Sequence, residues 1–404
     1  MPFARALRSS GIAMTDPIYL DYNATTPLRP EVLDAMRPWF EPGGQGNPSS
    51  THPAGRRARA AIDAARAHVA AAIGAQPDEI VFTGGGTEAS NIAIIGSAWA
   101  DDEAGGRRTK IVTSTIEHPA TSRPCELLAT RGREIVRIPV DSVGCVRADN
   151  VAAACGNGET TLLVSIMHSN NETGALQPIA DVARRVKPKG VRVHTDAAQS
   201  LGKVPLNVDD LGVDLLTIAG HKLYAPKGVG ALYARRGTPV SPVLRGAGHE
   251  RGLRPGTENV PYIVALGEAC RLVCEQLVQV SGHLRAMRDR LWARLSAAVP
   301  GLVLNGPAGD PSGRLPNTLS VRFPRGASGN RLLAAAPGVA ASTGSACHEG
   351  GAETASAVIL AMGVPAADAL GTVRLSVGHF TTGDEADRAA DELVRAFETV
   401  APAP

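Results

Sequence analysis

The chain has few aromatic side chains and few cysteines, and each shortage excludes a class of protein. Only 3% of its 404 residues are Phe, Trp or Tyr, and its six cysteines include no CxxC pair. Such sparse cysteine content excludes a disulfide-bonded scaffold and favours a reducing cytoplasm. No group of His and Cys residues has the spacing of a metal site, so no metal centre is expected.

Long apolar runs and charge of one sign are also missing. The absence of any run of 18 apolar residues predicts no transmembrane helix and no membrane partner. The 41 basic and 39 acidic side chains give a net charge of +2 without a basic block, so DNA is not an expected partner. Residues 1–17 lack the apolar core of a signal peptide, and we expect a disordered extension there, with Met14 as an alternative start.

What the chain does have is a regular alternation of strand and helix patterns. From about Glu79 to Arg235, short β-branched runs alternate with Ala-rich helical stretches, as in "EIVFTGGG" followed by "TEASNIAIIGSAWA". This pattern predicts an α/β fold with a mostly parallel sheet covered on both faces. A long helical segment, roughly residues 260–299, then leaves the sheet. The remainder predicts a smaller α+β domain, ending in the helix "GDEADRAADELVRAFETV".

Several of the expected strands end in polar residues. Ligands of parallel sheets lie beyond the carboxyl ends of the strands, so these residues are site candidates. In "FTGGGTEASN" three glycines precede Thr87 and a helix, an arrangement that binds phosphate but is also a common turn. In "VHTDAAQS" Asp196 ends a strand and Gln199 follows one helical turn later, although Asp196 could serve only as a helix cap.

Two more strand ends carry candidates, each with a plain structural alternative. His118 ends the strand in "STIEHPA", where a lone histidine is more often structural than catalytic. Asn170 and Asn171 in "HSNNETG" could be turn residues.

Lys222 is the most informative of these residues. It follows the apolar run "VDLLTIAGH" at the mouth of the predicted sheet, beside His221. Lysine is seldom buried, and partial desolvation there would make its amine a nucleophile, whereas a solvated turn lysine is the alternative. Together with the phosphate cradle, the acid and the planar His118, Lys222 completes the set that pyridoxal 5'-phosphate (PLP) chemistry requires.

An ordered series of motifs extends this interpretation across nearly the whole chain, from Ile18 to Thr382. It resembles the motifs of the cysteine desulfurase and selenocysteine lyase family: "YLDYNATTPLRPEV", "GNPSSTHPAGR", "FTGGGTEASN", "IEHPA", "MHSNNETG", "HTDAAQSLGKVPLNV", "GHKLYAPKGVGALY", "GHERGLRPGTEN", "STGSACHEG" and "VRLSVGHFTT". The resemblance implies a homodimeric, class V aminotransferase-like enzyme of PLP fold type I, with a seven-stranded sheet. It implies a large PLP-binding domain at 28–262 and a small domain made of 18–27 and 263–404.

The resemblance also implies a role for each candidate residue. Lys222 would form the Schiff base with PLP and move the Cα proton, with His118 stacked on the ring. The resemblance further implies that Asp196 contacts the ring nitrogen and Gln199 the phenolic oxygen. The phosphate would be bound by Gly86, Thr87 and His221 of the same subunit and by Thr257 of the partner subunit. The implied substrate contacts are Asn23, Asn171, which also orients the cofactor, and Arg374, whose guanidinium would hold the substrate carboxylate by two hydrogen bonds.

Cys347 is the expected sulfur-accepting nucleophile. It lies in "STGSACHEGG", a segment rich in small and polar residues that is unlike the core setting of an ordinary buried cysteine. The resemblance implies that its thiolate takes sulfur from L-cysteine as a persulfide, leaving alanine, before transfer to an unidentified acceptor protein.

Three alternatives in function stay open at this point. A selenocysteine lyase would use the same residues on L-selenocysteine. Two features resemble that branch: Ala219, at a position where many desulfurases carry serine, and the spacing from Cys347 to Arg374. His379 stands where the motif often has a second arginine, which leaves the role of that arginine open. An aminotransferase of the same fold would yield a keto acid and would have no use for Cys347. A non-catalytic scaffold is the third alternative.

Overall fold

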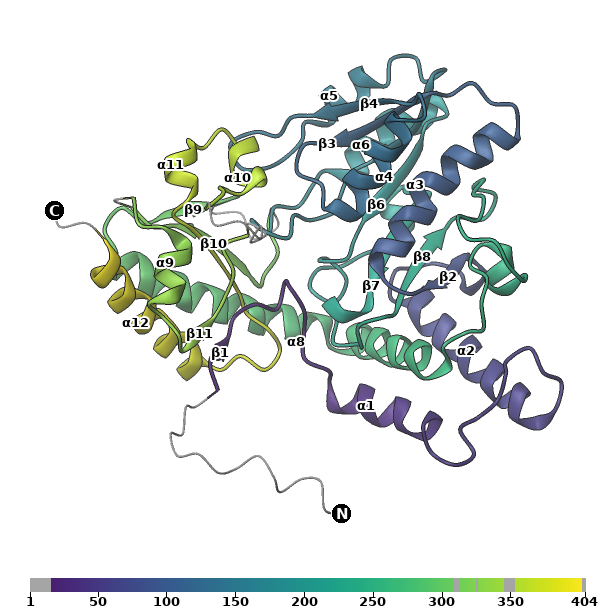
Figure 1. Ribbon diagram of the computed structural model, residues 1–404, viewed down its shortest axis with the longest axis horizontal. Coiled ribbons are helices and arrows are strands. Elements are labelled where there is room, and N and C mark those ends of the chain that lie inside the picture. Colours follow the sequence, from purple (N-terminus) through teal and green to yellow (C-terminus); the bar gives the residue numbers. More distant parts are fainter. Residues whose placement is uncertain (1–15, 309–312, 325, 345–352, 402–404) are drawn as a thin grey trace.

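A seven-stranded sheet forms the centre of the larger half of the molecule (Figure 1). The computed structural model describes residues 16–308, 313–324, 326–344 and 353–401. In this part of the chain, seven strands form the sheet in the order β2-β8-β7-β6-β5-β3-β4. Strands β4, β3, β5, β6 and β7 run parallel, and β8 is antiparallel to both β7 and β2. The strands are β2 (Ile80–Thr83), β3 (Lys110–Ser114), β4 (Glu134–Ile138), β5 (Thr161–Ser165), β6 (Arg192–Asp196), β7 (Leu215–Ala219) and β8 (Gly230–Ala234).

Helices cover both faces of this sheet, as the continuous apolar runs predicted (Figure 1). Successive strand residues face opposite ways: Leu163 and Leu215 pack into one apolar cluster, whereas Val164 and Leu216 pack into another. The first cluster lies under α3 (Gly86–Glu103) and α4 (Pro119–Ala129). The second lies against α2 (Pro53–Ala71), α5 (Ala148–Ala154), α6 (Ile179–Val186) and α7 (Val208–Leu211). The mostly parallel α/β sheet is therefore confirmed.

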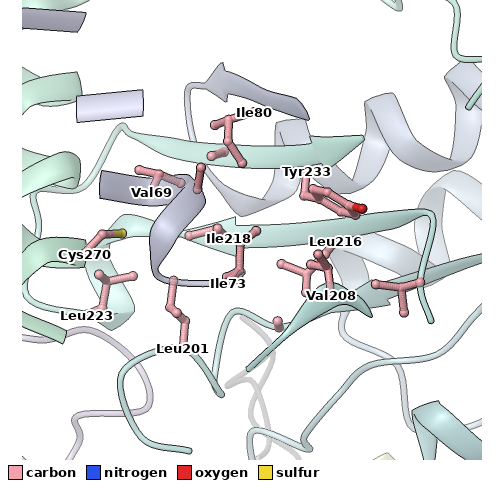
Figure 2. Packing of buried hydrophobic residues seen from close by; sticks show 14 of the residues in the cluster. Val69, Ile73, Ile80, Leu201, Val208, Leu216, Ile218, Leu223, Tyr233 and Cys270 are labelled. Atoms are coloured by element: carbon pink, nitrogen blue, oxygen red, sulfur yellow. The ribbon is translucent and has the colours of Figure 1, made fainter. Parts of the chain in front are cut away.

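The second cluster is the larger core of the protein. Figure 2 shows Ile80, Ile218 and Tyr233 on neighbouring strands, with Val69 of α2 and Cys270 of the long helix near them. All five side chains are buried. Burying a large aliphatic or aromatic side chain contributes about 1.5–3 kcal/mol. This packing holds the strands whose carboxyl ends build the site.

The long helix α8 (Val260–Ala298) connects the sheet to the rest of the molecule (Figure 1). Its residues up to Leu272 belong to the core of the large sheet, whereas Leu284, Leu291 and Leu295 belong to a separate apolar cluster. That cluster also contains Ile18 and Leu20 from the start of the described chain. The expected domain boundary at 262/263 thus falls inside α8, and the division into two domains stays our proposal.

The smaller half contains an antiparallel sheet in the order β12-β10-β9. The strands of this sheet are β9 (Val303–Asn305), β10 (Thr318–Arg322) and β12 (Thr372–Ser376). The helices of this half are α9 (Gly329–Ala334), α10 (Ala357–Ala361), α11 (Ala366–Ala369) and α12 (Gly383–Val400). Strand β1 (Ile18–Tyr19) returns to pair in parallel with β11 (Val339–Ala340). The helix α1 (Pro30–Met36) follows β1 in sequence and precedes α2. Among the described helices, none is long and apolar enough to cross a membrane.

Candidate active site

The predicted site residues gather where the parallel strands end. Asp196 is the last residue of β6 and pairs in register with Thr217 of β7, so the chain after β7 passes beside it. The short helix η4 (Gly220–Lys222) follows β7 directly and delivers Lys222. His118 is the N-cap residue of α4 and lies shortly after β3. The charges of Asp196 and Lys222 both act on His118, which shows that the three lie close together.

The amine of Lys222 is held by backbone carbonyl groups from the start of the chain. Nζ donates hydrogen bonds to Asn23 O at 2.5 Å and to Ala24 O at 2.7 Å. Burial, reinforced by the positive charge of Arg374, lowers the pKa of Lys222 to about 8. A larger share of the amine is therefore neutral near pH 7 than in a solvated lysine, which increases its nucleophilicity.

Asp196 is buried and keeps one oxygen free for a ligand. Its Oδ1 accepts a hydrogen bond from Ala198 N at 2.9 Å, and within the described residues Oδ2 has no hydrogen-bond partner. Burial raises the pKa of Asp196, and the hydrogen bond together with the positive charge of nearby groups opposes this shift. Asp196 thus makes the local backbone contact expected of a cap and still presents a carboxylate oxygen to the site.

His118 is an exposed ring with a defined protonation pattern. Its Nδ1 accepts a hydrogen bond from Ala120 N at 3.1 Å as the cap of α4. The surrounding protein atoms and the charge of Lys222 lower the pKa of His118, against the effect of Asp196. With Nδ1 unprotonated, the neutral ring carries its proton on Nε2. A neutral planar ring suits stacking on an aromatic ligand.

The N-terminus of α3 lies where the glycine motif predicted an anion cradle. The capping residue Gly85 has φ 150° and no side chain, and α3 begins at Gly86 with Thr87 exposed next to it. A methyl group on Gly86 would lie 3.0 Å from the Cβ of Ala219, at the end of β7. The side chain of Ala219 therefore faces this cradle. First-turn N–H groups and the helix dipole attract phosphate.

His221 and Thr257 were also expected at the phosphate. His221 Nδ1 lies 3.2 Å from Thr25 Oγ1, and burial and neighbouring cations, Lys222 first among them, lower its pKa to about 4. Thr257 is exposed just before α8. No hydrogen bond or ion pair between described residues joins Thr257 to Lys222 or His221. A contact from the partner subunit would account for its expected role, and it stays a prediction.

The carboxamide of Gln199 is oriented by a buried lysine that sequence reasoning did not single out. Lys203 Nζ donates to Gln199 Oε1 at 3.1 Å and to Gln199 O at 2.9 Å, while Gln199 Nε2 donates to Asn23 O at 2.8 Å. Burial, with a smaller contribution from nearby cations, lowers the pKa of Lys203 to about 7. The only sequence signal was a lysine one helical turn after Gln199 in an otherwise apolar stretch.

Asn23 joins the two halves of the molecule at the site. Its Nδ2 donates to Asn171 O at 3.1 Å and to Thr318 Oγ1 at 2.8 Å, and its Oδ1 accepts from Asn317 Nδ2 at 2.8 Å. Both of its amide donors are thus used inside the protein. A contact between the Asn23 side chain and substrate stays a prediction.

The two neighbouring asparagines have different settings. Asn170 is fully buried, and its Oδ1 accepts from Glu172 N and Thr173 N, so it is a turn residue. Asn171 is half-buried, and its carbonyl oxygen accepts a hydrogen bond from Arg374 Nη1 at 3.1 Å. Of the pair, Asn171 is therefore the one whose side chain is available to a ligand.

Arg374 is buried in β12 and paired with an acid that the motifs had not singled out. Its Nη2 donates to Asp21 Oδ1 at 2.7 Å. His379, further along the same segment, contacts Tyr224 edge-on at 6.1 Å, and its N–H donates to Tyr224 Oη. Cys347 lies outside the described residues, and the chain on either side of it is described up to Gly344 and from Glu353.

Comparisons with known proteins identify the family of the chain. The family model for aminotransferase class-V matches residues 18–389. Cysteine desulfurase IscS of Dictyoglomus turgidum is 43% identical over 95% of this chain and 95% of the relative, and selenocysteine lyase of Bos taurus is 42% identical over 94% and 93%. A solved structure of a NifS-like protein, 35% identical, superposes with a TM-score of 0.86 over 95% of this chain and 100% of its own. The resemblance inferred from the motifs is confirmed, and the chain belongs to the aminotransferase class-V family.

Proposed function

We propose that the protein is a PLP-dependent cysteine desulfurase, which converts L-cysteine to L-alanine and transfers the sulfur to Cys347. The observation that best supports this proposal is that three groups lie close together at the strand ends. They are the desolvated amine of Lys222, the buried carboxylate of Asp196 and the neutral ring of His118. The relatives named as cysteine desulfurases, at 41–43% identity over nearly the whole chain, support this choice of reaction.

The polar groups of the site match the chemical groups of PLP. The cradle at Gly86 and Thr87, with His221 beside it, suits the phosphate, and the free oxygen of Asp196 suits a protonated ring nitrogen. Gln199 has a second amide hydrogen for the phenolic oxygen, and Lys222 would bind the aldehyde covalently. When bound, PLP supplies an electron-accepting ring conjugated with the substrate's Cα.

The chain's own groups divide the remaining work. Arg374 would bind the substrate carboxylate, with Asn171 next to it, and the amine of Lys222, once released by substrate, would take and return the Cα proton. The Cys347 thiolate would attack the substrate sulfur and break its bond to carbon. The electron pair of that bond stays with the three-carbon fragment, which is protonated and leaves as alanine while Cys347 keeps the sulfur as a persulfide.

The cellular setting is part of the proposal. We expect a cytoplasmic homodimer, in which Thr257 of the partner subunit completes the phosphate site, and a separate protein that accepts the sulfur from Cys347. The six cysteines without CxxC spacing are consistent with a reducing compartment.

One observation favours a second candidate function, selenocysteine lyase. Ala219 faces the phosphate cradle with no hydroxyl, as the apolar residue at this position of the lyases would, and a relative named selenocysteine lyase is 42% identical. The deciding experiment compares alanine release from L-cysteine plus a thiol with alanine release from L-selenocysteine, using the PLP-loaded enzyme. Alanine from both, with a persulfide on Cys347 that is absent in Cys347→Ala, is the expected result. No alanine from L-cysteine combined with rapid turnover of L-selenocysteine would establish the lyase instead.

A further inference from the structure

Glu172 is a buried carboxyl group beside the site that no step above uses. It directly follows Asn171, and its side chain is enclosed by protein. Burial raises its pKa to about 7, while a hydrogen bond from Ser356 and the charge of Arg374 oppose the shift. A carboxyl group is seldom buried without a specific partner, because desolvation is costly.

Two described residues that contact this carboxyl group stand on opposite sides of the Cys347 segment in sequence. Ser356 Oγ donates to Glu172 Oε2 at 2.5 Å and accepts from the N–H groups of Val358 and Ile359 at the start of α10. Gly344 packs so closely against the same oxygen that a methyl group on Gly344 would overlap it. Both flanks of residues 345–352 therefore converge on one carboxylate oxygen.

The flank before Cys347 is also attached to the strand that carries Arg374. Arg374 N donates to Ser342 O at 2.6 Å, and Ser342 N donates back to Arg374 O at 3.3 Å. Gly344 N then donates to Ser342 Oγ at 3.1 Å. Glu172 itself is anchored by its N–H, which donates to Asn170 Oδ1 at 2.9 Å. The carboxyl group thus connects the turn of Asn171 with both ends of the Cys347 segment.

We propose that Glu172 is a positioning residue for sulfur transfer, holding the flanks Gly344 and Ser356 so that the Cys347 thiol reaches substrate bound at Arg374. This inference rests on the proposed desulfurase function. Fixing both ends of a segment restricts the positions its middle can reach, which raises the effective concentration of the thiol at the substrate sulfur. Misplacement by about 1 Å can cost about 100-fold in rate.

The test separates the step that needs Cys347 from one that does not. Exchange of the Cα proton of L-alanine with D2O, followed by NMR, requires the cofactor, Lys222 and Arg374, but no sulfur transfer. Persulfide formation on Cys347 in a single turnover with L-cysteine, followed by mass spectrometry, requires all of them. We expect Glu172→Ala to slow persulfide formation by about 10- to 100-fold and to leave alanine exchange within about threefold of wild type.

Two further variants complete the design. Glu172→Gln keeps the shape and an acceptor oxygen for Ser356, so we expect it to restore most of the persulfide rate. Ser356→Ala removes the donor and should reproduce the defect of Glu172→Ala, and the double variant should be little worse than either single one, since both break one contact. If Glu172→Ala does not fold, the rates of persulfide formation and of alanine exchange in Ser356→Ala test the proposal instead.

Two results would overturn the inference. An equal loss of exchange and persulfide formation would mean that Glu172 supports the whole site, and an unchanged persulfide rate would mean that it holds nothing that sulfur transfer needs. Failure of the wild-type enzyme to form alanine or persulfide from L-cysteine is a separate outcome, because it refutes the proposed function and with it the step that Glu172 is proposed to assist.

Discussion

The buried Arg374 and the half-buried Asp21 form an ion pair, with Nη2 of the arginine 2.7 Å from Oδ1 of the aspartate. The side chain of Arg374 is only 7% exposed, and that of Asp21 is 22% exposed. The residue expected to bind a substrate carboxylate thus already holds a carboxylate of the protein. Asp21 orients the guanidinium, and if Arg374 binds the substrate carboxylate as we propose, Asp21 would compete with that carboxylate for Nη2.

Replacing Asp21 by asparagine should strengthen substrate binding. Asp21→Asn keeps an oxygen acceptor for Nη2 but removes the competing charge, so we expect the KM for L-cysteine to fall by about threefold or more, with a smaller change in kcat. Steady-state alanine release measures both. A KM that rises instead would show that orienting Arg374 outweighs the competition. Arg374→Lys is the companion variant and should raise KM by at least about tenfold, because lysine lacks the paired donors.

Lys222→Ala should abolish covalent attachment of PLP while leaving the fold intact. Lys222 Nζ is the amine held at the strand ends, and its hydrogen bonds to other described residues are those to the carbonyl groups of Asn23 and Ala24. Mass spectrometry after borohydride reduction would show the cofactor on wild type and none on the variant. Lys227→Ala is the matched control, because Lys227 is exposed five residues later. Cofactor retained covalently by Lys222→Ala would identify a different lysine, and Lys203, whose pKa the charge of Lys222 helps to lower, is one candidate.

Ala219→Ser should tighten cofactor binding by adding a hydrogen bond from the serine hydroxyl to the PLP phosphate. The side chain of Ala219 faces the N-terminus of α3 at Gly86, so a serine hydroxyl there would reach a phosphate in the cradle. One hydrogen bond to a charged group is worth about 1.5–3 kcal/mol, which predicts a Kd for PLP at least about tenfold lower. Titration of apoenzyme measures it, and pyridoxal, which lacks the phosphate, is the control ligand. An equal gain for pyridoxal would place the new hydroxyl away from the phosphate.

The buried histidine His194 should make the fold sensitive to acid. Burial lowers the pKa of His194 to about 3, whereas the unfolded chain takes up a proton near its model value of 6.5. The stability it contributes is therefore complete above pH 6.5 and is lost as the pH falls towards 3, by about 1.4 kcal/mol per pH unit. His168, whose pKa burial lowers to about 4, acts in the same direction.

Replacing His194 tests this linkage directly. His194 Nδ1 lies 2.8 Å from Ser165 Oγ, and asparagine can keep that hydrogen bond. We expect the free energy of unfolding of His194→Asn, measured in urea, to fall by about 2 kcal/mol less than that of wild type between pH 7 and pH 5. His68→Asn, on the half-buried face of α2, is the control. An identical pH dependence for His194→Asn and wild type would contradict the assignment.

The fold was predictable because its signals are local. Alternating apolar and helical patterns between Glu79 and Arg235 specify strands and helices, and right-handed crossovers then leave few arrangements other than a parallel sheet. The position of β8, antiparallel at the interior of the sheet, was not predictable in this way, since strand direction depends on the connection after Lys222. Helix α8 likewise shows a continuous helical pattern, yet only its packing reveals that it belongs to two cores.

The candidate site divides along the same line. Lys222, Asp196, His118 and the glycines before Thr87 lie at or shortly after the ends of strands. Their place at the carboxyl ends of the sheet could therefore be predicted from the sequence alone. Cys347 was likewise singled out from the sequence motif around it. Only the tertiary structure decided that Asp21 pairs with Arg374, that Lys203 orients Gln199, and that Glu172 meets Ser356 across 184 positions of sequence. The Asp21–Arg374 and Glu172–Ser356 pairs depend on how distant parts of the chain pack, and the local Lys203–Gln199 pair depends on the burial of both side chains. Burial removes water as a partner and leaves each polar group dependent on the residue that the fold places beside it.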